Sequence, residues 1–494
     1  MIIINKGHSF DYEMEKLARL FMPFERIVAA DDIGSEKNYA VCSVYEQNGE
    51  TYTSAHLVLG SKQSEHTEKA SGITGNKRKK CQLTLARQLF YCFRDITGYL
   101  PEWGILTGIR PAKLYSQLVC SLGEELAQKA FCADYLANAN KISLCKEAHE
   151  GENKIISLSS PMSYSLYLSV PFCPSRCSYC SFVSHSIERA QDMIPQYVEY
   201  LLKELEITAK IAKQNNLKLE TVYMGGGTPT TLSADELKTV LSAVRKNFDM
   251  SAVREFTVEA GRPDTITAEK LAVIKQCGAT RISINPQTLN DDVLKAIGRN
   301  HTSQQTVDAF NLARSMGFDN INMDIIAGLP CDTVESFAKT LDGIIALDPE
   351  SVTVHALSMK RASTLNAHGD FPELEAGRTA AIMVDTARKT LTERGVLPYY
   401  MYRQSKTVGN LENVGYAKKG FEGLYNVYIM DETHTILACG ASAVTKLKAY
   451  DTGDISRIFN FKYPYEYIGR FEEQIQRKEG IGEFYDKHFG AYKQ

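Results

Sequence analysis

Three cysteines on one short loop are the residues of this chain whose spacing points most directly to chemistry. Cys173, Cys177 and Cys180 form a C-x3-C-x2-C pattern directly after the apolar run 164–172. Thiolates at such short spacings hold iron–sulfur clusters. Three thiolates can hold three irons of a [4Fe–4S] cube, which leaves the fourth iron open to a small molecule, as the open position does in a catalytic metal site. The trio therefore predicts a cluster that binds a ligand.

Two other interpretations of the trio are a zinc site that lacks its fourth ligand and a chance grouping among twelve cysteines. Structural zinc takes four ligands, usually supplied in pairs, and no second C-x2-C or H-x3-H pair occurs in the sequence. The remaining cysteines are scattered, and we interpret them as small core residues: Cys42, Cys81, Cys92, Cys120, Cys132, Cys145, Cys277, Cys331 and Cys439.

The elements that must position this loop follow a strand–helix repeat. Strand-like runs occur at 164–172, 219–226, 254–260, 281–287, 320–329 and 351–359, each followed by a segment of helical length. Capping boxes begin at Ser233 and Thr302, and Gly278, Gly317 and Gly395 stand where helices should end. Repeated βα units with short connections predict a parallel α/β barrel or an open sheet.

In a parallel barrel the reactive groups lie at the carboxyl ends of the strands. The second run ends in Gly225-Gly226-Gly227-Thr228-Pro229, where three glycines allow the backbone to approach a ligand closely. A phosphate-binding loop is the competing interpretation, but no G-K-[ST] follows these glycines. The next runs place further polar side chains at the same predicted rim: Glu259, Gln287, Asp324 and His355.

The cysteine pattern, with Tyr179 before its last member, resembles the radical S-adenosylmethionine (SAM) enzymes. The longer string from Tyr167 to Phe182 is similar to the oxygen-independent coproporphyrinogen III oxidases, or dehydrogenases, and their relatives. Asn322-Met323-Asp324-Ile325-Ile326-Ala327-Gly328-Leu329-Pro330 resembles that family's N-x-D-x-I-x-G-L-P signature. The resemblance covers roughly residues 160–450 and implies a partial (β/α)6 barrel.

The resemblance implies two cofactors, a [4Fe–4S] cluster and SAM. In that superfamily the open iron binds the amino and carboxylate groups of SAM, and an electron from the cluster cleaves SAM to a radical that abstracts hydrogen. The cluster ligands would be Cys173, Cys177 and Cys180. The implied SAM contacts are Tyr167, Tyr179, Gly226, Gly227, Thr228, Glu259, Gln287, Arg299 and Asp324. An ionised Glu259 would accept hydrogen bonds from the ribose hydroxyls.

By the same resemblance the reaction would be oxidative decarboxylation of coproporphyrinogen III to protoporphyrinogen IX, an oxidoreductase step in porphyrin and heme biosynthesis. Family members commonly carry a further Cys two residues after the third, where this chain has Phe182. The Phe form also occurs in relatives that resemble heme carriers or chaperones. Two alternatives therefore stay open, a heme-trafficking protein and another radical SAM reaction on a tetrapyrrole.

A substrate with four propionates needs cations near the barrel mouth to orient it, and arginine binds carboxylates bidentately. The candidates that follow the last strand are Lys360, Arg361 and Arg403. A positive charge beside a loop is more often merely solvated. The partners expected are thus a tetrapyrrole, either coproporphyrinogen III or heme, and an electron donor that the sequence does not identify.

The flanking segments predict two further domains. Residues 1–155 indicate an α+β domain of unknown role, with strands at 2–4, 39–45 and 52–59 and a helix over 81–95. Gly104 to Pro111 is a turn into a helix, and Arg110 and Lys113 beside it could bind an anion or could simply be a solvated helix start. We assign residues 160–395 to the barrel.

Residues 396–494 predict a tyrosine-rich α+β cover domain, with antiparallel strands at 424–430 and 435–446 and a helical end from Tyr463. Aromatic residues of this kind would suit a flat tetrapyrrole, although they more often form a packed core.

Composition bounds the remaining possibilities. A net charge of −3 gives no electrostatic case for nucleic acid or an anionic membrane. No apolar run approaches the roughly 20 residues of a membrane span, and Met1 to Asn5 lack the features of a secretory signal. We therefore expect a cytoplasmic protein with reduced cysteines.

Overall fold

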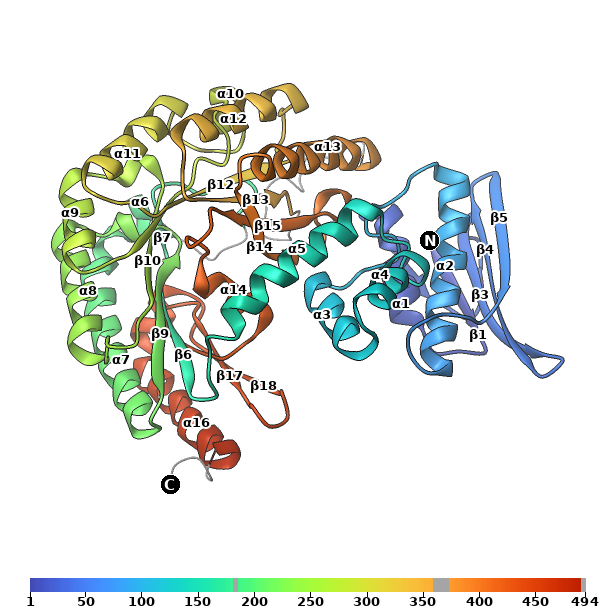
Figure 1. Ribbon diagram of the computed structural model, residues 1–494, viewed down its shortest axis with the longest axis horizontal. Helices are drawn as coiled ribbons and strands as arrows, with labels where there is room; N and C mark the ends of the chain where they lie inside the picture. The colour runs from blue at the N-terminus through green and yellow to red at the C-terminus, as the bar shows by residue number, and fades with distance from the viewer. Residues whose placement is uncertain (181–184, 359–372, 490–494) are drawn as a thin grey trace.

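The computed structural model describes residues 1–180, 185–358 and 373–489. Its N-terminal part is a sheet in the order β2-β1-β3-β4-β5. The strands are β1 (Ile2–Lys6), β2 (Val28–Ala29), β3 (Asn38–Gln47), β4 (Glu50–Leu59) and β5 (Lys62–Lys69). Helices α1 (Asp11–Phe21) and α2 (Lys77–Thr97) pack on this sheet, as Figure 1 shows at its right-hand side. The predicted strands and the predicted helix of this region are confirmed.

Three helices connect this sheet to the rest of the molecule. They are α3 (Pro111–Leu122), α4 (Glu124–Ala133) and α5 (Ala139–Ile156). Pro111 occupies the first turn of α3, as its fixed φ favours. Helix α5 runs from the N-terminal part toward the barrel and packs along β14 (Leu397–Arg403) (Figure 1).

The second sheet has the order β14-β15-β13-β12-β11-β10-β9-β6-β16-β17-β18. Its parallel strands are β6 (Ser163–Val170), β9 (Lys218–Gly226), β10 (Glu255–Gly261), β11 (Arg281–Ile284), β12 (Ile321–Ala327) and β13 (Ser351–Ala356). These strands match the six runs read from the sequence, so the partial (β/α)6 barrel is confirmed.

Helices cover the outside of this curved sheet (Figure 1). They are α7 (Ile194–Gln214), α8 (Ala234–Asn247), α9 (Ala268–Gln276), α10 (Asp291–Ala296), α11 (Ser303–Ser315), α12 (Val334–Leu347) and α13 (Glu373–Thr392). Both predicted capping boxes are present, at Ser233 and Thr302. Gly278, Gly317 and Gly395 have positive φ values where helices end, as glycine does after a helix.

Residues 396–494 add strands to both edges of the barrel sheet. At one edge β14 and β15 (Glu412–Ala417) join β13 in antiparallel pairs. At the other edge β16 (Thr435–Cys439) pairs parallel with β6, and β17 (Val444–Lys448) and β18 (Ile455–Phe459) follow antiparallel. The predicted helical end is confirmed as α15 (Pro464–Gly469) and α16 (Phe471–Phe489).

The prediction of a strand at 424–430 is wrong, because this segment is the helix α14 (Leu424–Asp431). The amides of Leu424 and Tyr425 donate to the buried carboxylate of Glu255, at 2.7 and 3.2 Å. An anion at the first turn satisfies amides that a helix leaves unpaired. The segment is apolar on all sides, as buried helices are, so it lacks the helical period that a surface helix shows.

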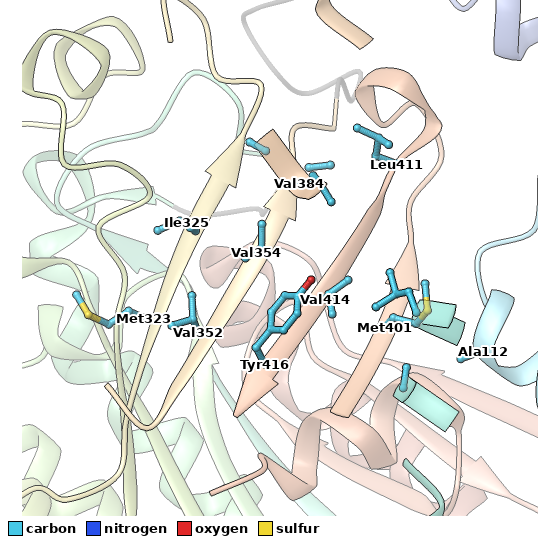
Figure 2. Close-up of a cluster of buried hydrophobic side chains, with 14 of the residues drawn as sticks. Ala112, Met323, Ile325, Val352, Val354, Val384, Met401, Leu411, Val414 and Tyr416 are labelled. Carbon is cyan, nitrogen blue, oxygen red and sulfur yellow. The ribbon is translucent and has the colours of Figure 1, made fainter. Parts of the chain in front are cut away.

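Apolar and polar side chains alternate along the strands, so one face of the sheet is apolar and the other is polar. Figure 2 shows the apolar face, where side chains from four neighbouring strands meet: Met323 and Ile325 of β12, Val352 and Val354 of β13, Val414 and Tyr416 of β15, and Met401 of β14. The residues between them, such as Asn322, Asp324 and Thr353, face the interior of the barrel. The same strands therefore supply both the core and the cavity wall.

A buried charge cluster fastens the N-terminal part to the barrel. Glu412, at the start of β15, accepts from Lys141 Nζ at 2.8 Å and from Trp103 Nε1 at 2.7 Å. The Lys141, Glu412 and Trp103 side chains are all essentially inaccessible to solvent. Buried charges of this kind are tolerated only when each has its partner.

We predict that Lys141→Met strongly destabilises the protein, because it leaves Glu412 charged and unpaired in the interior. Removal of one partner of a buried pair costs about 3–5 kcal/mol. The free energy of unfolding, measured by urea titration, tests this prediction. Lys129→Met is the matched control, since Lys129 pairs with Glu125 at 2.7 Å on the exposed surface and should change stability by less than about 1 kcal/mol. Equal effects of the two substitutions would contradict the anchoring role of Glu412.

Candidate active site

A cavity of about 550 Å³ occupies the barrel interior, within the roughly 300–1,000 Å³ typical of small-molecule sites. It extends from the cysteine loop to α14 and β17. Its lining includes every residue that the sequence predicted for the cluster and for SAM: Cys173, Cys177, Cys180, Tyr167, Tyr179, Gly226, Gly227, Thr228, Glu259, Gln287, Arg299 and Asp324. Residues spread over more than 150 positions of sequence thus share one cavity.

The cysteine loop is held by the glycine turn that follows β9. Gly227 N donates to Val170 O and Thr228 N donates to Phe172 O, both at 2.8 Å. A Cβ at Gly227 would lie 2.5 Å from Phe172 O and 3.0 Å from Cys173 Sγ. Only glycine permits so close an approach, so this turn brings its backbone directly against the first cysteine.

Hydrogen-bond donors surround the cysteine sulfurs. Thr228 Oγ1 donates to Cys173 Sγ at 3.6 Å, and Arg262 Nη1 donates to Cys177 Sγ at 3.8 Å. Hydrogen bonds to sulfur tune the potential of iron–sulfur clusters. Within the described residues no group of His, Cys, Asp and Glu side chains is arranged to hold a single metal ion. The cysteine loop thus has a hydrogen-bond donor beside two of its three sulfurs.

Several buried polar atoms that face this cavity have no hydrogen-bond partner among the described residues. They are Gln287 Oε1, Arg299 Nε and Arg281 Nε, on side chains that are each less than 10% exposed. Unsatisfied buried polar groups are uncommon in proteins and point to a missing partner. The wall of the cavity thus offers polar groups to a ligand, which fits a polar cofactor such as SAM.

Glu259 is half-buried and accepts a hydrogen bond from the Tyr223 hydroxyl. Burial raises the pKa of Glu259 to about 7. Tyr223 in turn stacks on Tyr425, with ring centroids 4.4 Å apart, and Tyr167 stacks on both. The carboxylate therefore lies beside an aromatic wall, and a hydrogen bond from the Gly226 backbone partly offsets the effect of burial on its pKa.

Asp324 lies across the same cavity. Burial raises its pKa, but the neighbouring His355 and a hydrogen bond from Asn322 outweigh burial and leave the pKa below its usual value. His355 Nε2 is 3.8 Å from Asp324 Oδ2, and Asn322 Nδ2 donates to Asp324 Oδ1 at 2.7 Å. His355 is thus a cavity residue that holds Asp324, and not a core histidine.

The cations predicted for the substrate are placed differently. Arg403 is only 3% exposed and does not line the cavity. Its guanidinium donates to Leu106 O at 2.8 Å and lies over the Trp103 ring. This placement contradicts the expected substrate contact, because the Arg403 guanidinium instead binds residues of the N-terminal part. Lys360, Arg361 and Phe182 lie outside the described residues.

The tyrosines of the C-terminal part are divided between the cavity wall and the core. Tyr400, Tyr402 and Tyr425 line the cavity, whereas Tyr399, Tyr416, Tyr428 and Tyr467 are buried in the core. Tyr223, Arg262 and Lys446 also line the cavity and are not among the predicted site residues. Tyr223 could have been found, since it lies two residues before Gly225 on the same face of a strand. Lys446 carried no local signal, because it depends on a strand added at the far edge of the sheet.

Comparison with known proteins bears on this site. The radical SAM superfamily pattern matches residues 167–344. The chain is 36% identical over 476 residues to the oxygen-independent coproporphyrinogen-III oxidase-like protein HemZ of Bacillus subtilis, which covers 94% of each chain. It is also 37% identical over 194 residues to the heme chaperone HemW of the same organism, but this match covers 39% of the chain and 50% of HemW.

Among solved structures, the coproporphyrinogen III oxidase HemN of Escherichia coli superposes with a TM-score of 0.51 at 22% identity, over 65% of this chain and 72% of HemN. That likeness shows a shared fold. The radical SAM proteins use a [4Fe–4S] cluster and SAM, and the cysteine trio and polar cavity wall have the chemistry to hold both. With near-complete coverage by HemZ, the chain belongs to the oxygen-independent coproporphyrinogen-III oxidase-like family of radical SAM proteins.

Proposed function

We propose that this protein is a radical SAM enzyme that oxidatively decarboxylates propionate side chains of coproporphyrinogen III. The observation that carries the proposal is a single cavity that joins the cysteine trio, the SAM-type polar rim and an aromatic wall. The similarity to an oxidase-like protein along 94% of the chain supports an activity of the same class. A heme carrier would need a site for the tetrapyrrole. It would not need a cluster and SAM to abstract hydrogen.

When bound, the reduced cluster and SAM supply abstraction of a hydrogen atom. The protein's own residues would hold the reactants in place for that step. Cys173, Cys177 and Cys180 would bind the three irons, while Glu259 and Asp324 would bind polar groups of SAM. Tyr167, Tyr223 and Tyr425 form a stacked aromatic wall beside Glu259. Each propionate would lose a hydrogen atom, CO2 and one further electron, which an external acceptor must take, to give a vinyl group.

The alternative is a heme-binding carrier on the same scaffold. The match to the heme chaperone HemW favours it for the barrel, as does Phe182 in place of a further cysteine. The matches to HemW proteins cover between 39% and 63% of the chain, whereas the match to HemZ covers 94% of it. The full-length similarity therefore weighs toward the oxidase-like activity.

We predict that the anaerobically reconstituted protein holds one oxygen-sensitive [4Fe–4S] cluster and that Cys177→Ala abolishes it. Iron analysis and electron paramagnetic resonance of the reduced protein provide the measurement. Cys439→Ala is the matched control, since Cys439 is a buried cysteine of β16 that does not line the cavity. A full cluster in Cys177→Ala with loss in Cys439→Ala would show that the ligands are assigned wrongly.

We predict that Glu259→Gln and Asp324→Asn weaken SAM binding and leave the iron content unchanged. Each substitution removes a charged acceptor worth about 1.5–3 kcal/mol, or roughly ten- to a hundredfold in affinity. Calorimetric titration of the reconstituted protein with SAM provides the measurement. Asp319→Asn is the control, because Asp319 is an exposed residue just before β12 and its loss should change nothing.

The pKa of about 7 at Glu259 adds a pH test of this same assignment. The ionised carboxylate is the better acceptor for ribose hydroxyls, so SAM affinity should fall as pH drops below about 7 and Glu259 is protonated. The fall should approach tenfold per pH unit and should be absent in Glu259→Gln. The same pH profile in both proteins would show that another group titrates.

We predict that the protein, incubated anaerobically with SAM, a strong reductant and coproporphyrinogen III, releases CO2 and forms protoporphyrinogen IX, detected by product chromatography. Cys177→Ala is the control and should give no product, because the cluster is lost. If the wild-type protein instead binds heme stoichiometrically and releases no CO2, the decarboxylase proposal fails and the carrier function takes its place.

A further inference from the structure

The part of the cavity wall that β17 supplies contains a lysine without a partner among the described residues. Lys446 of β17 lines the cavity together with the apolar residues Ile429, Met430 and Val444. Its half-buried ammonium makes no hydrogen bond and no ion pair with a described residue. Burial lowers the pKa of Lys446, an effect that Arg110 and Arg457 reinforce by repulsion. A desolvated cation without a counter-ion is costly.

The nearest carboxylate is already occupied by other cations. Glu432 accepts from Arg110 Nη1 through one oxygen and from Arg457 Nη2 at 3.2 Å through the other. Both oxygens of Glu432 are engaged, so Glu432 does not pair with Lys446. Its charge raises the pKa of Lys446 by less than burial lowers it. The two arginines thus keep Lys446 available to an external anion.

The position of Glu432 is itself unusual. Glu432 has φ 61° at the C-terminal end of α14, a left-handed conformation that glycine normally supplies. A glutamate in this conformation is strained. Its carboxylate is held between Arg110 and Arg457. The end of α14 therefore places the Glu432 carboxylate between the two arginines.

The surrounding charge is positive. Arg110, Lys113, Lys446, Lys448 and Arg457 interact electrostatically with one another or with the acids Asp431, Glu432 and Asp454. Five cations thus face three carboxylates. Arg110 is the N-cap of α3 and Lys113 lies in its first turn, so the N-terminal part supplies two of these charges.

We propose that Lys446 binds a carboxylate of the substrate, and that Arg110 of the N-terminal part keeps it free to do so by neutralising Glu432. The ligand class is an anionic macrocycle, with its hydrocarbon body against Ile429, Met430 and Val444 and one propionate on Lys446. This inference rests on the proposed function for the identity of the macrocycle. It also assigns the N-terminal part a role, which is to complete the charge balance of the substrate site.

The test is binding of coproporphyrin III, a stable tetracarboxylate, to the full-length reconstituted protein, followed by fluorescence anisotropy. Lys446→Met should weaken binding roughly tenfold or more, the effect of losing one charge-assisted contact, and Lys446→Arg should restore most of it. Coproporphyrin tetramethyl ester lacks the negative charges, so its binding should not distinguish wild type from Lys446→Met.

Lys448→Met is the matched control. Lys448 lies two residues farther along β17, in the same group of cations, but its Nζ donates to Gly453 O at 2.7 Å and it does not line the cavity. Its loss should leave binding unchanged. Arg110→Met should weaken binding as Lys446→Met does, because Glu432 would then be free to pair with Lys446.

The outcomes of these binding experiments distinguish failure of the Lys446 site from failure of the proposed decarboxylation. Equal affinity of wild type and Lys446→Met for coproporphyrin III, equal losses in Lys446→Met and Lys448→Met, or no porphyrin binding by wild type would each overturn the Lys446 site, whatever the turnover. Lys446-dependent binding in a protein that releases no CO2 would support the site and overturn the decarboxylase.

Discussion

The backbone pairing at the ends of β6 and β9 is the constraint on which the site depends. Val170 pairs with Gly226, and the next two amides of the glycine turn donate to Val170 O and Phe172 O. These bonds fix where the cysteine loop leaves the sheet. The far side of the loop is held by Ser178 N, which donates to Ile297 O at 3.0 Å. The loop is thus held on one side by the ends of β6 and β9 and on the other by the residue that ends α10.

Polar side chains inside the barrel need hydrogen-bond partners, and side chains of neighbouring strands supply them. Asn322 Oδ1 accepts from Ser351 and Thr353, while its amide donates to Asp324. Residues that bind neighbouring side chains in this way cannot rearrange freely, so Asp324 is oriented in advance. Preorganised polar groups act on a ligand without the cost of reorientation. The atoms left unsatisfied, such as Gln287 Oε1, therefore mark where a ligand completes the network.

The sequence predicted what depends on local pattern and failed where tertiary structure decides. The six strands and the rim residues followed from periodicity and from the rule that parallel strands end at one rim, so Glu259 and Asp324 could be placed without coordinates. Arg403 follows a strand in the same manner, but its direction is set by carbonyls of residues 106 and 108, nearly 300 positions away. Likewise, α14 is helical because Glu255, far away in sequence, binds its first amides. No local signal reports such partners.

The N-terminal part illustrates how a domain without a catalytic motif can still shape a site. Its contacts with the barrel include two charged points, Lys141 and Trp103 on Glu412, and Arg110 on Glu432. The first point lies at the start of β15 and the second at the end of α14, which forms part of the cavity wall. A domain fastened at both places restrains the edge of the sheet and the helix inside it together. The similarity to HemZ extends along nearly the whole chain, whereas the match to HemW covers 39% of it. This difference in coverage is expected if the extra domain belongs to the substrate side of the site, as we propose, and the barrel to the shared SAM chemistry.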